Sequence, residues 1–293
     1  MKPPVKLDFL VIGAYKSGTT SVQAFLRQHP EIFVPRTKEP SFWAVPQDGR
    51  GTDRPIPAHA VRDPDEYASL FCEAPAGSLR GEVSPEYLPS DVAPPAVAAA
   101  LPGVRLVAVL RDPIDRAWSD WVMYAREGRE RLDFEAALEE QDRRAAMGDP
   151  TGFYLSTGMY ATQLRRWLEH FPREQLAILF FDDLRSDPRK FSATLFRELG
   201  VSPHVSVDLR PRKQGGPPPS RFASLVLRAR RRSGRLAELL PRRVRRAVLR
   251  RLAPTGRPTV APRHVRQLLA PVFREEIEAV EEIAGRDLSE WKR

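Results

Sequence analysis

The sequence of 293 residues has no asparagine, a single cysteine, Cys72, and no apolar run long enough to cross a membrane. A membrane span needs roughly 18–20 consecutive apolar residues, so we expect no membrane-spanning helix. The apolar run Phe9 to Gly13 is too short for the core of a signal peptide. A lone cysteine excludes an internal disulfide and favours a reducing compartment. Together these absences predict a cytoplasmic protein without a membrane anchor.

The chain has fewer acidic than basic residues: 38 Asp and Glu and 47 Lys and Arg, which give a formal net charge of +9. The excess is local, since residues 210–251 hold 15 basic residues and one glutamate, a net of +14, and the remainder carries −5. Such a block can bind nucleic acid or an anionic membrane surface, or it can be solvated helix surface. No stacking pattern of aromatic residues accompanies the arginines, so we expect no nucleic-acid partner.

Short apolar segments alternate with amphipathic ones along most of the chain. Strands are predicted at residues 8–13, 78–84, 104–110 and 175–181. Helices are predicted at 21–28, from Pro113, from Asp133, at 158–171, at 188–199 and at about 262–284. This alternation predicts an α/β fold with a central parallel sheet flanked by helices on both faces. No internal repeat is present, and we expect a single domain over residues 1–293 with a variable basic helical segment at about 216–260.

The segment after the first predicted strand has the composition of an anion-binding loop. Two glycines allow the backbone to approach a ligand closely, and the following helix start offers N–H groups and a positive dipole end. An ammonium and three hydroxyls add further donors. The residues concerned are Lys16, Ser17, Gly18, Thr19 and Thr20. The spacing is neither that of a Walker A loop nor that of a dinucleotide fingerprint. The loop predicts a phosphate or sulfate site; an ordinary strand–helix turn is the alternative.

A second strand end carries an arginine. Arg111 follows the third predicted strand, and Ser119 lies two helical turns further on. Ligands of open α/β sheets bind at the carboxyl edge of the strands, so two such strand ends predict a ligand with two phosphate groups. A surface ion pair with Asp112 or Asp115 is the alternative for Arg111, and it stays open for Arg116.

Short motifs follow one another in order through nearly the whole chain. They are Lys16-Ser-Gly-Thr-Thr20, Lys38-Glu-Pro-Ser-Phe-Trp43, Gly81-Glu-Val-Ser-Pro-Glu-Tyr-Leu88, Arg111-Asp-Pro-Ile-Asp-Arg-Ala-Trp-Ser119, Gly128 with Phe134-Glu-Ala-Ala-Leu138, Gly158-x-Tyr160 with Trp167 and Phe171-Pro172, and Gly285-Arg-Asp-Leu-Ser-Glu-Trp291. In this order and spacing the chain resembles the sulfotransferases that use 3′-phosphoadenosine 5′-phosphosulfate (PAPS), most closely their bacterial and heparan-sulfate-type branch. The resemblance implies a P-loop-like fold and sulfuryl transfer from PAPS to a hydroxyl or amine of a carbohydrate, lipid-linked glycan or small metabolite.

The resemblance also implies roles for individual residues. Lys16 would neutralise charge developing on the leaving phosphate, and Glu39 matches the family's catalytic base. A solvated loop residue paired with Lys38 is the alternative for Glu39. Arg111 and Ser119 match positions that bind the 3′-phosphate. The implied nucleotide-binding residues are Lys16, Ser17, Gly18, Thr19, Thr20, Arg111 and Ser119, with Arg212, Lys213, Gln214 and Gly215 as the best match to a glycine-basic loop.

The resemblance implies no metal, and the five histidines show no metal-ligand spacing. Val83 stands where relatives often carry a lysine before Ser-Pro, so one expected cation is missing. A P-loop kinase is one alternative function, and a nucleic-acid or membrane-surface binder that uses the arginine block is another. With no disulfide and no anchor, we expect a bacterial enzyme of the cytoplasm with a small-molecule or glycan acceptor. The sequence makes no prediction of oligomeric state.

Overall fold

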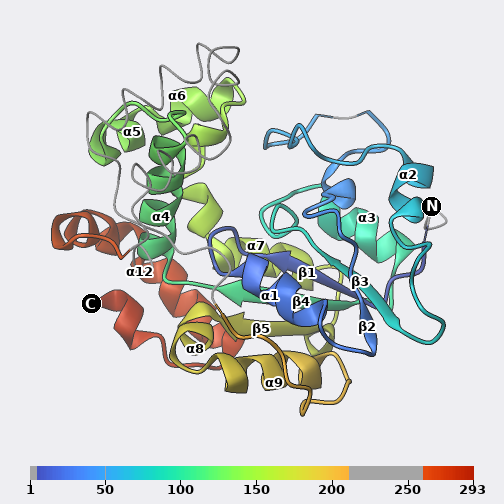
Figure 1. Cartoon of the computed structure of the whole chain (residues 1–293). Helices are drawn as coiled ribbons and strands as arrows, with labels where there is room; N and C mark the ends of the chain where they lie inside the picture. Colours follow the sequence, from blue (N-terminus) through green and yellow to red (C-terminus); the bar gives the residue numbers. More distant parts are fainter. Residues whose placement is uncertain (1–4, 50, 211–259) are drawn as a thin grey trace, which may run out of the picture. The chain divides into compact units, whose positions relative to one another are not determined.

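The computed structural model of the chain describes residues 5–49, 51–210 and 260–293 and contains a parallel sheet. Within these residues the sheet has five strands (Figure 1). In spatial order they are β2 (Ile32–Phe33), β3 (Leu79–Val83), β1 (Phe9–Gly13), β4 (Arg105–Leu110) and β5 (Leu176–Phe180). Because every pairing is parallel, the carboxyl ends of all strands meet at one edge of the sheet.

The chain divides into two compact units. The first comprises Met1–Asp112, Met159–Arg212 and Phe273–Arg293 and holds the sheet. Its helices are α1 (Thr19–Leu26), α2 (Pro64–Ser69), α3 (Ala93–Ala100), α7 (Tyr160–Leu168), α8 (Phe181–Ser186) and α9 (Pro188–Glu198), with the 3-10 helices η1 (Phe42–Ala44), η4 (Arg173–Gln175) and η5 (Ser289–Lys292). The residues of α12 (Arg263–Ala284) are shared between the two units.

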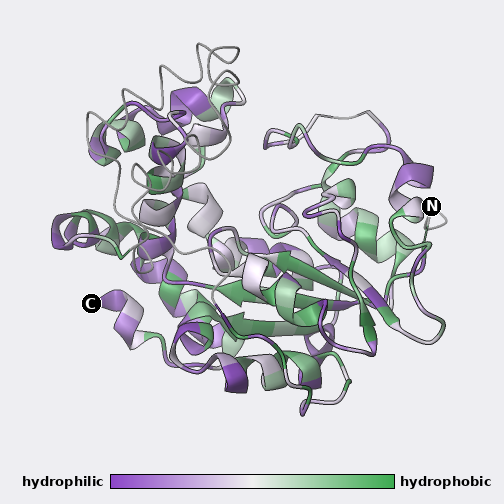
Figure 2. Cartoon of the chain, viewed as in Figure 1, coloured by the Kyte–Doolittle hydropathy of each residue, from purple (hydrophilic) through white to green (hydrophobic). Residues whose placement is uncertain are grey.

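Both faces of the sheet are buried, which confirms the predicted fold class. Successive side chains of a strand point to opposite faces. Phe9 and Val11 of β1 join an apolar cluster with residues of α1, α8 and α9. Leu10 and Ile12 point the other way and are 0% exposed. β1, β4 and β5 are mostly hydrophobic (Figure 2), whereas β3 also carries Arg80 and Glu82.

The second unit, Pro113–Gly158 with Lys213–Val272, consists of helices where it is described. They are α4 (Pro113–Arg126), α5 (Phe134–Glu139) and α6 (Gln141–Ala146), with the 3-10 helices η2 (Pro150–Gly152) and η3 (Ser156–Gly158). Arg116 of α4 is 0% exposed; it donates to Asp120 Oδ2 at 3.4 Å and to the carbonyl oxygen of Tyr154. A surface ion pair for Arg116 is therefore wrong, because the guanidinium lies inside the unit.

Two predictions concerned the start of α5 and the absence of a membrane-spanning helix. Asp133 caps α5 by accepting from Ala136 N at 3.0 Å, as an aspartate before an amphipathic run predicts. Among the helices of residues 5–49, 51–210 and 260–293, none is both long and apolar enough to cross a membrane.

Candidate functional site

The segment between β1 and α1 turns sharply at the carboxyl edge of the sheet. Gly18 precedes α1 in the left-handed conformation, with a φ of 87°, and Lys16 also has a positive φ, of 64°. A Cβ atom on Gly18 would lie 2.6 Å from Leu184 Cδ2, so both its backbone conformation and its surroundings require glycine. No side chain of the described residues caps α1, and its N-terminus therefore offers its first N–H groups to an anion.

Arg111 brings a second cation to this loop. It directly follows β4, is 4% exposed, and donates from Nη1 to the carbonyl oxygen of Lys16 at 3.2 Å. Its Cζ lies 4.9 Å from the ring centroid of Phe181. Ala14 N donates to Val109 O at 2.8 Å and fastens the loop to β4. Arg111 is therefore not a surface residue, because it is buried against the loop of Lys16 to Thr20.

Glu39 lies in the loop that follows β2, at the same edge of the sheet. Its φ is 53°, as is that of Ser41. The Glu39 side chain is 14% exposed and forms an ion pair with Lys38 Nζ. The pairing expected of a plain loop residue is thus present, but the carboxylate is largely withdrawn from solvent. The loop that follows β3 is fixed to β1, since Ser84 N donates to Val11 O at 3.0 Å.

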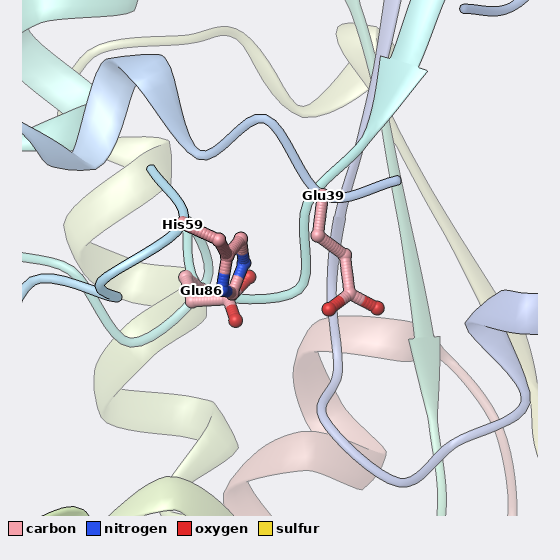
Figure 3. A group of neighbouring side chains, drawn as sticks. All are labelled: Glu39, His59 and Glu86. Atoms are coloured by element: carbon pink, nitrogen blue, oxygen red, sulfur yellow. The ribbon is translucent and has the colours of Figure 1, made fainter. Parts of the chain in front are cut away.

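A histidine and a second glutamate lie beside Glu39 (Figure 3). Glu39, His59 and Glu86 each offer a ligand atom, and these atoms lie within 4.8 Å of one another. Burial, and after it the negative charge of Glu39, raise the pKa of Glu86 to about 8. Two carboxylates and an imidazole suit a divalent transition metal. Both carboxyl groups already have partners, however, because Lys38 pairs with Glu39 and Ser41 Oγ donates to Glu86 Oε2 at 3.3 Å.

A second buried glutamate of this region, Glu82 of β3, accepts hydrogen bonds from three hydroxyl groups. Its exposure is 1%, and burial raises its pKa to about 7 although hydrogen bonds act in the opposite direction. Tyr67 Oη donates to Glu82 Oε1 at 2.9 Å, and Tyr87 Oη donates to the same oxygen. Ser84 Oγ donates to Glu82 Oε2 at 2.6 Å. The ordinary cost of a buried carboxyl group is thus offset by three donors.

The other predicted nucleotide-binding residues are spread over the chain. Ser17 is buried and its Oγ lies 3.4 Å from Tyr15 O. Ser119 lies in α4 of the second unit and is 8% exposed. The structure brings Arg111 into contact with the loop of Lys16 to Thr20. That Arg111 and Ser119 together bind the 3′-phosphate stays a prediction. Arg212, Lys213, Gln214 and Gly215 lie outside the described residues.

Sequence reasoning missed the residues that surround Glu39. Glu82 and Glu86 lie inside the motif Gly81 to Leu88, on either side of the end of β3. A carboxylate next to the end of a buried strand was the signal that could have identified them. His59 lies in residues 35–65, a stretch rich in Pro, Asp and Gly, where no pattern marks it. Val83 is apolar and 1% exposed, so the end of β3 supplies no cation.

Comparison with known proteins gives one consistent family. Residues 8–204 match the model of the sulfotransferase family. The chain is 29% identical over 213 residues to human bifunctional heparan sulfate N-deacetylase/N-sulfotransferase 2, a match that covers 68% of this chain and 22% of that protein. It is 30% identical over 179 residues to human heparan sulfate glucosamine 3-O-sulfotransferase 3B1, which covers 61% of this chain and 42% of that protein. The chain thus spans about a fifth of the length of the first relative and under half of the second.

A solved structure extends the similarity to nearly the full chain. The crystal structure of a sulfotransferase from Alicyclobacillus acidocaldarius superposes with a TM-score of 0.75 at 26% identity. The superposition covers 99% of this chain and 100% of the other. The predicted fold, a parallel sheet of the P-loop-like kind with helices on both faces, is confirmed by this match.

Proposed function

Because the chain belongs to the sulfotransferase family, we propose that it transfers a sulfuryl group from PAPS to a hydroxyl or amine of a carbohydrate, lipid-linked glycan or small metabolite. The observation that carries the proposal is the anion loop of Lys16 to Thr20, which lies at the same sheet edge as Glu39. The named relatives act on heparan sulfate, which supports a glycan among the candidate acceptors.

The residues at this edge suit the charge of such a donor. The N-terminus of α1 and the ammonium of Lys16 would hold the 5′-phosphosulfate, with hydroxyls from Ser17, Thr19 and Thr20. Arg111 and Ser119 would hold the 3′-phosphate, and the segment Arg212 to Gly215 would cover the nucleotide. Gly18 supports the loop geometry, because a side chain there would collide with Leu184 and Phe181 and shift the helix start.

In the proposed reaction Glu39 and Lys16 act at opposite ends of the bond exchange. The acceptor oxygen or nitrogen forms a bond to sulfur as the bond between sulfur and the bridging phosphate oxygen breaks. Glu39 takes the acceptor proton, and Lys16 neutralises the negative charge that gathers on the departing phosphate. Arg111 keeps Lys16 in place through its hydrogen bond to the Lys16 carbonyl oxygen.

A thermal shift with 3′-phosphoadenosine 5′-phosphate (PAP) tests the proposal. At 100 times its Kd, PAP should stabilise the protein by roughly 2.7 kcal/mol. Lys16→Ala and Arg111→Ala should shrink this shift, while Glu39→Gln should keep it and abolish turnover of PAPS. The control is Lys6→Ala, which changes an exposed lysine before β1. The absence of any PAP shift in the unaltered protein would contradict the assignment.

We also propose that no metal takes part, since Lys16, Arg111 and the start of α1 supply positive charge at this edge. Turnover should then survive dialysis against EDTA. A loss of turnover that Zn²⁺ or Mn²⁺ restores would instead point to the group Glu39, His59 and Glu86. Dependence on Mg²⁺ together with ATP turnover would favour the P-loop kinase.

The remaining features of the proposal concern the chain as a whole. We propose that residues 1–293 act as a single catalytic domain, that the protein works in the cytoplasm and that it has no nucleic-acid partner. The lone cysteine supports a reducing compartment. Cell fractionation tests the location, and titration with DNA at low salt tests the partner.

A further inference from the structure

Glu82, Ser84 and Ser41 form a chain of hydrogen bonds that ends at the loop carrying Glu39. Ser41 N donates to Ser84 Oγ at 3.0 Å, and Ser84 Oγ donates to Glu82 Oε2 at 2.6 Å. All three residues are 0–1% exposed. We propose that Glu82 is a positioning residue for the loop of Glu39, acting through the hydroxyl of Ser84 on the backbone of Ser41. The inference rests on the proposed role of Glu39 as the base.

The direction of each hydrogen bond follows from the donors present. A serine hydroxyl has one proton and two lone pairs. Because the amide of Ser41 can only donate, Ser84 Oγ must accept from it, and the hydroxyl proton is left for Glu82. The carboxylate therefore fixes the rotation of the hydroxyl and keeps a lone pair aimed at Ser41. Glu82 Oε2 is thus the acceptor that draws the hydroxyl proton away from the lone pair facing Ser41.

The loop depends on such external support because its backbone is unusual. Glu39 and Ser41 both have a φ of 53°, a region that residues other than glycine enter only when their surroundings hold them there. Ser41 Oγ lies 3.1 Å from the carbonyl oxygen of Glu39 and 3.3 Å from Glu86 Oε2. A shift of Ser41 would thus move the backbone of Glu39 and release Glu86 together.

Glu82 is itself held from its other oxygen. Tyr67 and Tyr87 both donate to Oε1, and Trp43 Nε1 donates to Tyr67 Oη at 3.1 Å. Loss of the Tyr67 hydroxyl weakens the network at Oε1 of Glu82, the oxygen to which Ser84 does not donate. Tyr67→Phe is therefore a matched control: it removes one hydrogen bond from the same carboxyl group and leaves the path to Ser41 intact.

The test compares Glu82→Gln and Ser84→Ala with Tyr67→Phe. The first two should lower kcat by about 10²-fold, the loss expected from a small displacement of a catalytic group, and should leave the PAP-induced thermal shift unchanged. Tyr67→Phe should lower the melting temperature and keep kcat near that of the unaltered protein. Amide hydrogen exchange over residues 38–43 should be faster in Ser84→Ala and unchanged in Tyr67→Phe.

Several results would overturn the proposal. One is a Ser84→Ala variant that loses stability like Tyr67→Phe but keeps kcat. Another, which needs no variant, is fast exchange of the Ser41 amide in the unaltered protein, since that proton is placed in a buried hydrogen bond. Normal turnover by Glu39→Gln would refute the base role instead, and the exchange measurements would still decide whether Glu82 orders the loop.

Discussion

Two carboxyl groups at the carboxyl edge of the sheet are held away from water, those of Glu82 and Glu86. Their pKa values are raised from 4.5 to about 7 and about 8, with burial as the largest cause. Each therefore keeps its proton to a higher pH in the folded state than in the unfolded chain. The unfolded state then binds fewer protons, so the free energy of unfolding falls as the pH rises from about 5 to 8.

Glu86→Gln should remove part of this pH dependence. One carboxyl group contributes at most about 1.4 kcal/mol per pH unit to the slope, and glutamine has no proton to lose. Urea unfolding between pH 5.5 and 8.5 measures the change, and Glu66→Gln, on the exposed face of α2, is the control. Parallel slopes in the unaltered protein and Glu86→Gln would show that Glu86 ionises as readily in the folded as in the unfolded state.

Gly18 is the residue on which the anion loop turns. Alanine at this position meets both a φ of 87° and Leu184 Cδ2 at 2.6 Å. Gly18→Ala should abolish the PAP-induced thermal shift and cost about 1–3 kcal/mol of stability. Gly77→Ala separates the two causes, because Gly77 has a φ of 80° but no described atom within 4 Å of the position that a Cβ would take. The control should lose some stability and keep the PAP shift; a PAP shift retained by Gly18→Ala would contradict the loop assignment.

At the scale of elements, the sequence predicted those strands and helices that carry their own boundaries. β1, β3, β4 and β5 all lie within the predicted ranges. β1, β4 and β5 are apolar runs with a glycine or a polar residue close to their end, whereas β3 also carries Arg80 and Glu82. The helices predicted from Asp133 and at 188–199 were also confirmed. α2 was not predicted, although Asp63 caps it and Pro64 begins it. β2 was not predicted, because its two residues show no periodicity, and α8 was missed because it follows β5 with no intervening turn.

The cap of α9 gives a prediction at this scale. Asp187 Oδ1 accepts from Lys190 N at 2.9 Å, which satisfies one N–H of the first helical turn. Asp187→Ala should lower the free energy of unfolding by about 1 kcal/mol, while Asp187→Asn should lower it little because its side-chain oxygen can still accept. Chemical denaturation measures both variants, and equal losses would show that the cap is not the source of the stability.

The candidate site was predictable only in part, for a reason that lies in the connections between elements. The anion loop and Arg111 follow strands directly, so the parallel order of the strands brings them to one edge. Ser41 and Ser84 are 43 positions apart in the chain, and Ser41 and Glu86 are 45 apart. These contacts depend on the pairing of β2 with β3, and no spacing in the sequence predicts that the two strands are neighbours.

On the scale of the whole molecule, the net charge of +9 is the sum of a block of +14 at residues 210–251 and a remainder of −5. The proposed chemistry uses Lys16 and Arg111, which lie outside this block. Nearly all of the block lies outside the described residues. Its function is therefore considered from its charge alone. A cationic segment raises the local concentration of an anionic acceptor, and the effect is screened by salt.

If the block recruits an anionic acceptor, its neutralisation should act on KM and leave kcat unchanged. Replacing Arg242, Arg243, Arg245 and Arg246 with glutamine should raise KM for an anionic oligosaccharide about tenfold at low salt, with a smaller effect at high salt. The control makes the same change in net charge at Arg62, Arg189, Arg197 and Arg274, all exposed. An equal rise in both variants would assign the effect to net charge. An unchanged KM at low salt would show that the block is solvated surface with no part in acceptor binding.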